Sequence, residues 1–276
     1  MFDNFNMNIT NETIVGYSWD VSAPEFVVCI VHGIGEHAGR YDRMAMRMQE
    51  NKIAVLSMDL RGHGLSGGKR GHCAPRETVL SDVDQLIQEA GTRYPGVPVI
   101  LYGHSMGGNI VLDYRMRGRK KEVPLACVVS APWILLVRKV NRMLILAMTV
   151  MSRLKPDFQI KAGIRNEDLG NVKVISDQAH KELRHDFITA RTAMDGNKIG
   201  EVLLNSATAG NKRLLLMHGD ADRICSVEGS RMFSKVAQNC EYVEWPGYYH
   251  EIHNGSGEKD GEAVINFIIE WIKEKA

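Results

Sequence analysis

The stretch Val99-Ile100-Leu101-Tyr102-Gly103-His104-Ser105-Met106-Gly107-Gly108 decides the fold of this chain. Its four apolar residues predict a buried strand and the residues from Gly108 predict a helix, so the Gly-x-Ser-x-Gly segment lies on a sharp strand-to-helix turn. Small neighbours permit such a turn, which lifts the serine hydroxyl to the edge of the sheet. The helix N-terminus and the backbone N–H of Met106 then point toward any oxyanion that develops there. These features predict that Ser105 is a nucleophile.

Short apolar runs rich in β-branched residues alternate with helical patterns on both sides of this turn. Such runs are typical of strands buried on both faces of a parallel sheet, and their alternation with helices implies right-handed crossovers and a doubly wound α/β fold. We expect buried strands at Phe26–Val31, Ile53–Leu60, Val97–Tyr102, Leu125–Val129 and Arg213–Met217, a further strand at Glu241–Trp245, an antiparallel edge strand at Ile14–Trp19, and helices at Tyr41–Glu50, Thr78–Arg93, Gly108–Arg117, Glu228–Gln238 and Gly261–Lys275.

The alternation breaks between about Trp133 and Asn205, where only helical patterns and loops are found. An insertion of this length is expected to form a functional lid or subdomain. We therefore expect residues 1–132 and 206–276 to form the core domain and residues 133–205 to form an inserted helical cap. Residues 133–155 have the pattern of one basic amphipathic helix, and such helices pack on a main domain, cover an apolar pocket or lie in a membrane interface. Its basic face holds Arg138, Arg142, Thr149 and Arg153, and its apolar face holds Trp133, Leu136, Val140, Leu144, Ala147 and Met151.

The composition excludes several classes of protein. The 276 residues include 34 Lys and Arg against 33 Asp and Glu, a balance that argues against a nucleic-acid partner because phosphate binding needs an excess of cations. Five cysteines make no disulfide framework and are expected to be free thiols in a reducing compartment. The N-terminus lacks the pattern of a secretory signal, and no window has the ~18 uninterrupted apolar residues of a membrane span. We expect a soluble, cytoplasmic protein.

Two short patterns resemble motifs that bind a dinucleotide or zinc, but each departs from its motif. The run Gly62-x-Gly64-x-x-Gly67 matches the dinucleotide pattern, but the charged residues that follow it contain Pro75, so no helix begins there. The segment His250-Glu251-Ile252-His253 is one residue shorter than the His-Glu-x-x-His spacing of a zinc site. We therefore expect an activity that needs neither a cofactor nor a metal ion.

A serine alcohol is a poor nucleophile without a base and a group that orients the base. In this class of fold the chain order is serine, acid, histidine. Two carboxylates, Asp220 and Asp222, follow one buried strand, and two imidazoles, His250 and His253, follow the next. We favour Asp222 as the acid and His250 as the base, and we expect the other carboxylate to hydrogen-bond the loop.

A second N–H for the oxyanion is expected from a loop after an earlier strand. The segment His32-Gly33-Ile34-Gly35 follows Phe26–Val31, and its glycines let the backbone approach a substrate closely. We predict that the N–H groups of Ile34 and Met106 are the two donors. The alternative is a glycine turn that holds no ligand.

Together these motifs resemble the α/β-hydrolase superfamily and, within it, the monoacylglycerol lipase and lysophospholipase-like group. They run in the order of the family from about residue 24 to the C-terminus. The blocks that carry the resemblance are His32-Gly33-Ile34-Gly35-Glu36-His37-Ala38-Gly39-Arg40-Tyr41, Asp59-Leu60-Arg61-Gly62-His63-Gly64-Leu65-Ser66, Gly103-His104-Ser105-Met106-Gly107-Gly108, Ala221-Asp222-Arg223-Ile224-Cys225 and Tyr249-His250-Glu251-Ile252-His253.

The resemblance implies roles for further residues. It supports Asp222 as the acid, His250 as the base and Ile34 and Met106 as the oxyanion donors, although alanine or another small residue is usual at the first donor. Glu36, Arg40 and His253 match positions near the polar head of a monoglyceride, and Cys225 matches a cysteine beside the pocket. For Glu36 and Arg40 the alternative is a surface ion pair at positions i and i+4. Lys181-Glu182-Leu183-Arg184-His185 stands where Asp-Pro-Leu-x-His is usual, so substrate preference does not carry over from the family.

The sequence thus predicts a serine hydrolase that cleaves carboxylic esters of lipids through an acyl-enzyme, with a monoacylglycerol as substrate and with fatty acid and glycerol as products. A lysophospholipase and a broad carboxylesterase, including one for aryl esters, are the alternatives among enzymes. A non-catalytic hydrolase-fold protein that binds a ligand is disfavoured because Ser105, Asp222 and His250 are all present. The basic, apolar insertion further predicts a peripheral membrane contact through the cap.

Overall fold

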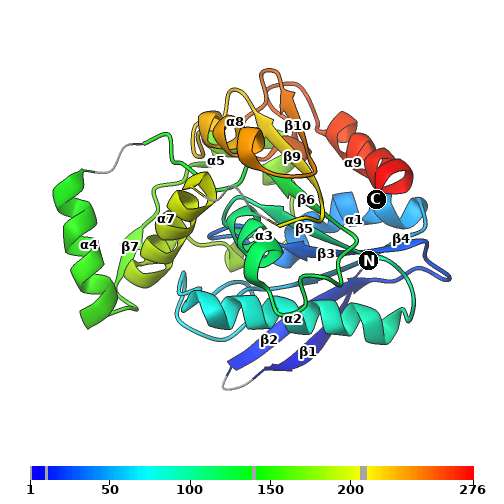
Figure 1. Cartoon of the computed structure of the whole chain (residues 1–276), viewed down its shortest axis with the longest axis horizontal. Helices are drawn as coiled ribbons and strands as arrows, with labels where there is room; N and C mark the ends of the chain where they lie inside the picture. Colours follow the sequence, from blue (N-terminus) through cyan, green and yellow to red (C-terminus); the bar gives the residue numbers. More distant parts are fainter. Residues whose placement is uncertain (1, 10–11, 139–140, 206–209) are drawn as a thin grey trace.

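The computed structural model describes residues 2–9, 12–138, 141–205 and 210–276 of the chain. Its centre is an eight-stranded sheet with the order β1-β2-β4-β3-β5-β6-β9-β10 (Figure 1). The pairs from β4 to β10 are parallel, whereas β1 and β2 pair antiparallel at one edge. The strands are β1 Asp3–Ile9, β2 Glu12–Trp19, β3 Phe26–Val31, β4 Ile53–Met58, β5 Val99–His104, β6 Ala126–Ser130, β9 Arg213–Gly219 and β10 Cys240–Trp245.

The strand order reverses direction between β3 and β5. The chain passes from β3 outward to β4 and then returns to the other side of β3 to form β5. In an open α/β sheet, the crevice at the carboxyl ends of the strands at such a switch point is where ligands bind. The loop that begins at His32 and the turn at Ser105 both leave the sheet at this point.

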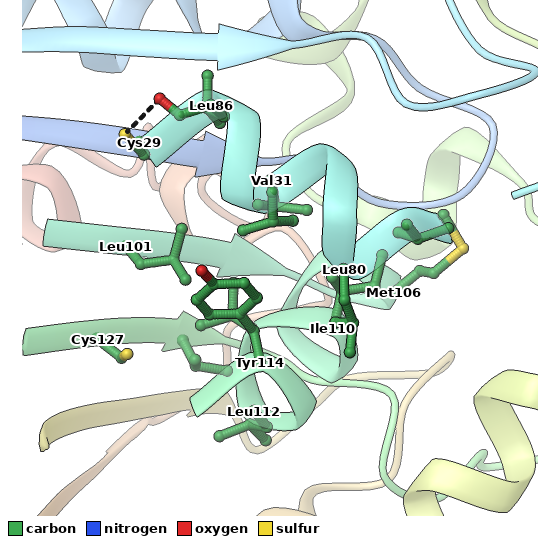
Figure 2. Close-up of a cluster of buried hydrophobic side chains, with 14 of the residues drawn as sticks. Cys29, Val31, Leu80, Leu86, Leu101, Met106, Ile110, Leu112, Tyr114 and Cys127 are labelled. Atoms are coloured by element: carbon green, nitrogen blue, oxygen red, sulfur yellow. Dashed lines mark hydrogen bonds between the residues drawn. The ribbon is translucent and has the colours of Figure 1, made fainter. Parts of the chain in front are cut away.

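Helices cover both faces of the sheet because the side chains of each central strand alternate between two hydrophobic cores. Val28 and Ile30 of β3 face the core that includes side chains of α1 and α9, whereas Val27, Cys29 and Val31 face the core beneath α2, α3 and α8. Figure 2 shows the second core, where β3, β5 and β6 meet α2 and α3. The helices are α1 Asp42–Glu50, α2 Arg76–Arg93, α3 Met106–Arg117, α8 Val227–Val236 and α9 Glu262–Lys275.

The predicted doubly wound sheet is confirmed, and the strands and helices expected outside residues 133–205 are present with boundaries that differ by a few residues. The strand predicted at Ile14–Trp19 is antiparallel but does not form the edge, because β1 pairs along its outer side. The sequence analysis missed β1. Its alternating asparagines have low strand propensity, but Phe5 alternates with them and packs under Gly16, where a Cβ would lie 2.3 Å from the ring.

Between β6 and β9 the chain leaves the sheet. This part was expected to hold helices and loops only, and that expectation is wrong, since β7 and β8 form a small antiparallel pair. The expected division of the chain into a core and a cap at residues 133–205 remains a prediction, and its boundary at residue 206 lies outside the described residues. The elements here are α4 Arg142–Leu154, β7 Gln159–Lys161, α5 Asn166–Leu169, α6 Val172–Ser176, a 3₁₀ turn at Lys181–Leu183, β8 Phe187–Thr189 and α7 Ala190–Asn205.

The single helix predicted for residues 133–155 is also wrong, because helix α4 begins only at Arg142. Residues 133–138 form bends and an isolated bridge to the loop after β9: the N–H of Val137 donates to the Ile224 oxygen at 3.0 Å, and the N–H of Ser226 donates to the Leu135 oxygen at 2.8 Å. These tertiary hydrogen bonds override the local helical pattern. Val140, assigned to the helix, lies outside the described residues.

The predicted basic and apolar faces are not separated on helix α4. Thr149 and Arg153 of the predicted basic face line a cavity between α4 and α7, whereas Leu144 of the predicted apolar face is 51 % exposed. Figure 1 shows α4 at the outer end of the molecule, beside α7 and away from the sheet. Apolar side chains occur all around α4, so the pattern did not determine which side faces inward. The large exposed ones are Met143, Leu144, Ile145, Leu146, Val150 and Leu154.

Candidate active site

Ser105 sits in a strained backbone conformation at the turn between β5 and α3. Its φ of 56° and ψ of −117° are tolerated by few side chains, and the surroundings enforce them. A Cβ on Gly107 would lie 2.0 Å from the Val31 carbonyl oxygen, and a Cβ on Gly103 would lie 2.5 Å from the Gly107 oxygen. Both positions therefore require glycine, and the helix passes close to the sheet because of them. This explains why the Gly-x-Ser-x-Gly spacing appears here.

The predicted base lies within hydrogen-bond distance of the serine. His250, on the loop between β10 and α9, has its Nε2 atom 2.8 Å from Ser105 Oγ. Its Nδ1 atom lies 2.7 Å from Asp222 Oδ2. In neutral His250, Nδ1–H donates a hydrogen bond to the Asp222 carboxylate, so Nε2 has no proton and is free to accept the proton of the serine. The structure thus brings Ser105, His250 and Asp222 into one hydrogen-bonded chain, although the three come from loops far apart in the sequence.

The two alternative residues occupy other places. Asp220 Oδ1 accepts a hydrogen bond from the Gly247 N–H at 2.6 Å, as expected for the carboxylate that holds the loop. The His253 ring stacks on Tyr41, with ring centroids 5.3 Å apart, and is buried. Neither side chain joins the hydrogen bonds that link Ser105 to Asp222.

The charges of the site follow from burial and hydrogen bonding. Burial favours the neutral form of Asp222, but His250 and the hydrogen bonds from His218 and His250 outweigh it and hold the pKa of Asp222 below its usual range. Burial likewise favours neutral His250, but the charge and hydrogen bond of Asp222 outweigh it and raise the pKa of His250. Desolvation, with the neighbouring His250 and His253, takes the pKa of His104 well below its usual value. His250 is therefore the imidazole whose charged form this site stabilises.

The predicted oxyanion donors come from the loop after β3 and from the first residue of α3. Met106 is the first residue of α3, so its N–H has no partner in the preceding turn. Ile34 and Ser105 line the same cavity. The loop that carries Ile34 is fixed by Glu36, whose Oε1 accepts the Gly33 N–H at 2.5 Å. The N–H of Met106 is thus positioned by the start of α3, and the N–H of Ile34 is positioned by the hydrogen bond between Gly33 and Glu36 in its loop.

Glu36 and Arg40 form the i,i+4 ion pair of the alternative interpretation, with 2.6 Å between Oε2 and Nη1, but the pair is buried and does not lie on the surface. Both side chains are buried, because Glu251 approaches the same guanidinium from the loop next to His250. Arg40 donates from Nη1 and Nη2 to the two Glu251 oxygens at 2.7 and 2.8 Å. Its Nε donates to Oε1 of Gln178 at 2.7 Å, and Gln178 belongs to the part of the chain that connects β6 to β9. Arg40 therefore links three parts of the chain: the loop after β3 that carries Ile34 (the oxyanion loop), the loop after β10 that carries His250 (the histidine loop), and the residues between β6 and β9 (the inserted segment).

The cavity at Ser105 is closed in this structure. Its volume is about 50 Å³, which is room for one or two water molecules. Glu36 and Arg40 line it, whereas His253 and Cys225, the other two predicted substrate contacts, do not. The inserted segment closes it through hydrogen bonds from the His185 N–H to the Gly35 oxygen and from the Glu251 N–H to the Leu169 oxygen. The side chains contributed by the inserted segment are Ala162, Ile164, Leu169, Arg184, His185 and Asp186.

Several residues at the site were assigned no role in the sequence analysis. Glu251 lies in a quoted motif, but its pairing with Arg40 spans 211 residues and leaves no local pattern. His185 and Arg184 lie in the segment that departs from the family pattern. His218 precedes the acid by four residues and contacts it directly. Among the residues that the structure describes, no cluster of histidine, cysteine, aspartate and glutamate has an arrangement that would hold a metal ion.

A mostly parallel sheet with a serine on the turn after a central strand, and with an acid and a histidine on the loops after two later strands, defines an α/β-hydrolase. Residues 22–257 match the family described as serine aminopeptidase, S33, and the chain belongs to this family. Within it, the chain is a carboxylic ester hydrolase of the monoacylglycerol lipase-like group, as its relatives indicate.

Three curated proteins illustrate the similarity. A monoacylglycerol lipase of Mycolicibacterium smegmatis is 33 % identical over 90 % of this chain and 88 % of its own length. The phospholipase YtpA of Bacillus subtilis is 29 % identical over 88 % of this chain and 95 % of its own length. An uncharacterised abhydrolase domain-containing protein of Dictyostelium discoideum is 32 % identical over 96 % of this chain, which spans only 28 % of that protein.

Solved structures agree with these relatives. The crystal structure of the monoacylglycerol lipase of Paleococcus ferrophilus superposes with a TM-score of 0.82 at 29 % identity, and the match covers 93 % of this chain and 98 % of that one.

The direction of the His250 pKa shift predicts the pH dependence of the reaction. A base must be neutral to accept a proton, so kcat/KM falls as the pH drops through the pKa of His250. Because that pKa is raised above its ordinary value of 6.5, the midpoint of the acid limb is expected above pH 6.5.

The variant Asp222→Asn is expected to lower kcat by about 10⁴-fold, since the amide favours the wrong tautomer of the histidine.

Asp220→Asn is the matched control, because this carboxylate lies on the same loop but bonds only the Gly247 N–H. We expect its kcat to stay within about threefold of wild type, in line with the small effect of most changes away from the reacting groups. Steady-state rates on a soluble ester between pH 5 and 9 measure both effects. Equal losses for the two variants, or a midpoint below 6.5, would contradict this assignment.

Proposed function

We propose that this protein hydrolyses monoacylglycerols to free fatty acid and glycerol through an acyl-enzyme on Ser105. The observation that carries the proposal is the hydrogen-bonded chain from Ser105 Oγ through His250 to Asp222, at 2.8 and 2.7 Å. Its membership of the monoacylglycerol lipase-like group supports the substrate class. The protein is also proposed to act in the cytoplasm, where its five free cysteines stay reduced.

The reaction has two halves. In the first, His250 takes the proton of Ser105 as the oxygen attacks the ester carbonyl, and the N–H groups of Ile34 and Met106 stabilise the oxyanion. Asp222 holds the imidazole in its tautomer and stabilises the imidazolium. Glycerol leaves with the proton from His250. In the second half, His250 takes a proton from water, which attacks the acyl-enzyme, and the fatty acid leaves as Ser105 regains its proton.

An acyl chain needs more room than the cavity at Ser105 offers. A second cavity of about 520 Å³ lies between α4, α7 and residues 134–138 after β6. These residues follow Trp133, whose N–H donates to the Ser105 carbonyl oxygen at 3.0 Å, and the first of them, Ile134, lines the cavity. This volume is in the range of ligand pockets. We assign it to the acyl chain; the apolar lining residues are Ile134, Leu135, Leu136, Ile145 and Met194.

Substrate entry requires the inserted segment to move. The hydrogen bonds of His185 to Gly35 and of Leu169 to Glu251 hold it over a cavity of about 50 Å³, which admits no monoacylglycerol. Opening of a lid is a common gating step in such enzymes. We propose that opening breaks these hydrogen bonds and joins the cavity at Ser105 with the larger one beside α4.

The polar head is proposed to lie against Glu36 and Arg40, which line the cavity at Ser105. In its ion pair with Arg40, the Glu36 carboxylate is able to accept a hydrogen bond from a glycerol hydroxyl. His253 lies behind Tyr41 and does not line the closed cavity. We propose that His253 supports Tyr41, and that Cys225, buried beside the acid, contributes to the wall near Ser105.

A lysophospholipase is the second candidate. Arg184 reaches the cavity at Ser105, and Arg138, Arg153 and Lys198 line the cavity beside α4. These cations would attract a phosphate head group. The similarity to a phospholipase supports this candidate.

The exposed apolar side of α4 supports a peripheral membrane contact. Met143, Leu146 and Leu154 are 79 %, 68 % and 78 % exposed. Apolar side chains placed together in this way insert into the headgroup boundary of a bilayer. In the described residues, no helix is long and apolar enough to cross a membrane. We propose an adsorption that depends mainly on apolar contact by these side chains.

Substrate preference tests the proposed function. With Ser105→Ala as the blank, we expect monooleoylglycerol to exceed methyl oleate in kcat/KM by about tenfold, since both share the acyl chain and differ in the head. Lengthening the acyl chain by two methylenes raises kcat/KM by about tenfold until the cavity is filled. Equal rates on the two oleates would indicate a broad carboxylesterase. A higher rate on oleoyl lysophosphatidylcholine would indicate the lysophospholipase.

Adsorption to vesicles tests the membrane contact. The double variant Met143→Glu, Leu146→Glu is expected to lose at least about tenfold in binding to phosphatidylcholine vesicles, because each side chain buries apolar surface worth roughly 1.5–3 kcal/mol. Met232→Glu, on α8, is the control, since Met232 is also exposed, at 42 %, but lies outside the inserted segment. Cosedimentation measures both, and unchanged binding of the double variant would refute the contact.

A further inference from the structure

We propose that His218 is a positioning residue for Asp222, a second imidazole that holds the carboxylate in the orientation His250 requires. His218 lies near the end of β9 and its side chain is fully buried. Its Nε2 atom lies 3.0 Å from Asp222 Oδ2, the same oxygen that His250 approaches. This inference rests on the proposed function, because it assigns Asp222 to the triad.

The protonation of His218 follows from its neighbours. Nε2 faces two acceptors, Asp222 Oδ2 at 3.0 Å and the Cys225 carbonyl oxygen at 3.2 Å, so it carries a proton. Nδ1 lies 2.7 Å from Ser230 Oγ on α8, which supplies a hydroxyl that donates to neutral His218. A ring that accepts at one nitrogen is a stronger donor at the other, because hydrogen bonds in a chain polarise one another. Ser230 therefore strengthens the hydrogen bond from His218 to Asp222.

Each of the two carboxylate oxygens of Asp222 accepts two hydrogen bonds in this arrangement. Its Oδ1 accepts the N–H groups of Ile224 and Cys225 at 2.7 and 3.0 Å, and its Oδ2 accepts His250 and His218. Four donors fix a carboxylate that is fully buried. With one donor on Oδ2 removed, the carboxylate would be less stabilised and a stronger acceptor for His250. Removal of His218 is therefore expected to raise the pKa of His250 and to loosen its orientation.

Few other charged groups face this pair. Glu244 of β10 lies beside His218 and is paired with Arg231 of α8, so its charge is balanced. The Cys225 thiol is buried, which raises its pKa well above the usual range and keeps it neutral. His250 also faces Glu251, which Arg40 neutralises, and His104, which burial keeps neutral. The change in the His250 pKa would therefore report the loss of His218 itself.

The test compares His218→Leu, which removes the donor, with His218→Gln, which keeps an N–H near the same place. The readout is the rate at which a fluorophosphonate labels Ser105. In that reaction the Oγ–P bond forms, fluoride leaves and His250 takes the hydroxyl proton, so the rate needs the triad but no particular lipid. The leucine variant is expected to label about tenfold more slowly, with its acid limb about 0.5–1 unit higher in pH. The glutamine variant is expected to recover most of the rate and the wild-type limb.

Kinetics on a soluble ester separate positioning from binding. The leucine variant is expected to lose kcat with KM within about twofold of wild type, because His218 contacts Asp222 and does not line the cavity at Ser105. Unchanged rate and pH profile in the leucine variant would overturn the proposal. So would a loss shared equally by leucine and glutamine without any shift of the acid limb, since that is the result of a structural role.

Ser230→Ala keeps the proposal testable if the leucine variant does not fold. It is expected to move the acid limb upward by a smaller step, and Ser234→Ala, one turn further along α8, is expected to leave the limb unchanged, because its hydroxyl donates to the Arg231 carbonyl oxygen. Equal profiles for the two serine variants would overturn the proposal. A wild type that labels with the phosphonate but leaves monooleoylglycerol intact refutes the proposed function and not the positioning role.

Discussion

The active site depends on one backbone constraint, the turn that reverses the chain between β5 and α3. Ser105 adopts a positive φ at this turn, and Gly103 and Gly107 allow the helix to start almost in contact with the Val31 carbonyl oxygen. The strain is local, whereas the hydrophobic packing that sustains it extends through both cores of the sheet. The turn therefore holds the serine hydroxyl at the edge of the sheet, and the loops after β9 and β10 bring Asp222 and His250 to that point.

Buried charge around this turn is organised by pairing. Arg40 serves both Glu36 and Glu251, so the oxyanion loop and the histidine loop meet at one guanidinium. Asp222 receives four N–H donors. Buried charges that lose one partner are costly, so each network resists rearrangement. The inserted segment joins the first network through Gln178, and its closure is thereby coupled to the groups beside the reacting atoms.

The sequence was most informative where a local pattern has one physical cause. Gly-x-Ser-x-Gly after an apolar run predicted the turn, and the order of acid and histidine predicted which loops meet it. Contacts between distant segments were not predictable in the same way: the burial of Glu36 and Arg40 depends on Glu251, 211 residues away. The two predicted faces of α4 failed for another reason, since apolar side chains lie all around this helix and the neighbouring elements decide which side is covered.

The central claim is that this turn and the loop after β3 together form a site for an oxyanion. The structure of the enzyme after reaction with a long-chain alkyl fluorophosphonate tests it most directly. The account predicts phosphorus bonded to Ser105 Oγ, with the phosphonyl oxygen about 2.7–3.1 Å from the N atoms of both Ile34 and Met106. A phosphonyl oxygen bonded to neither N–H, or phosphorus attached to another side chain, would contradict it.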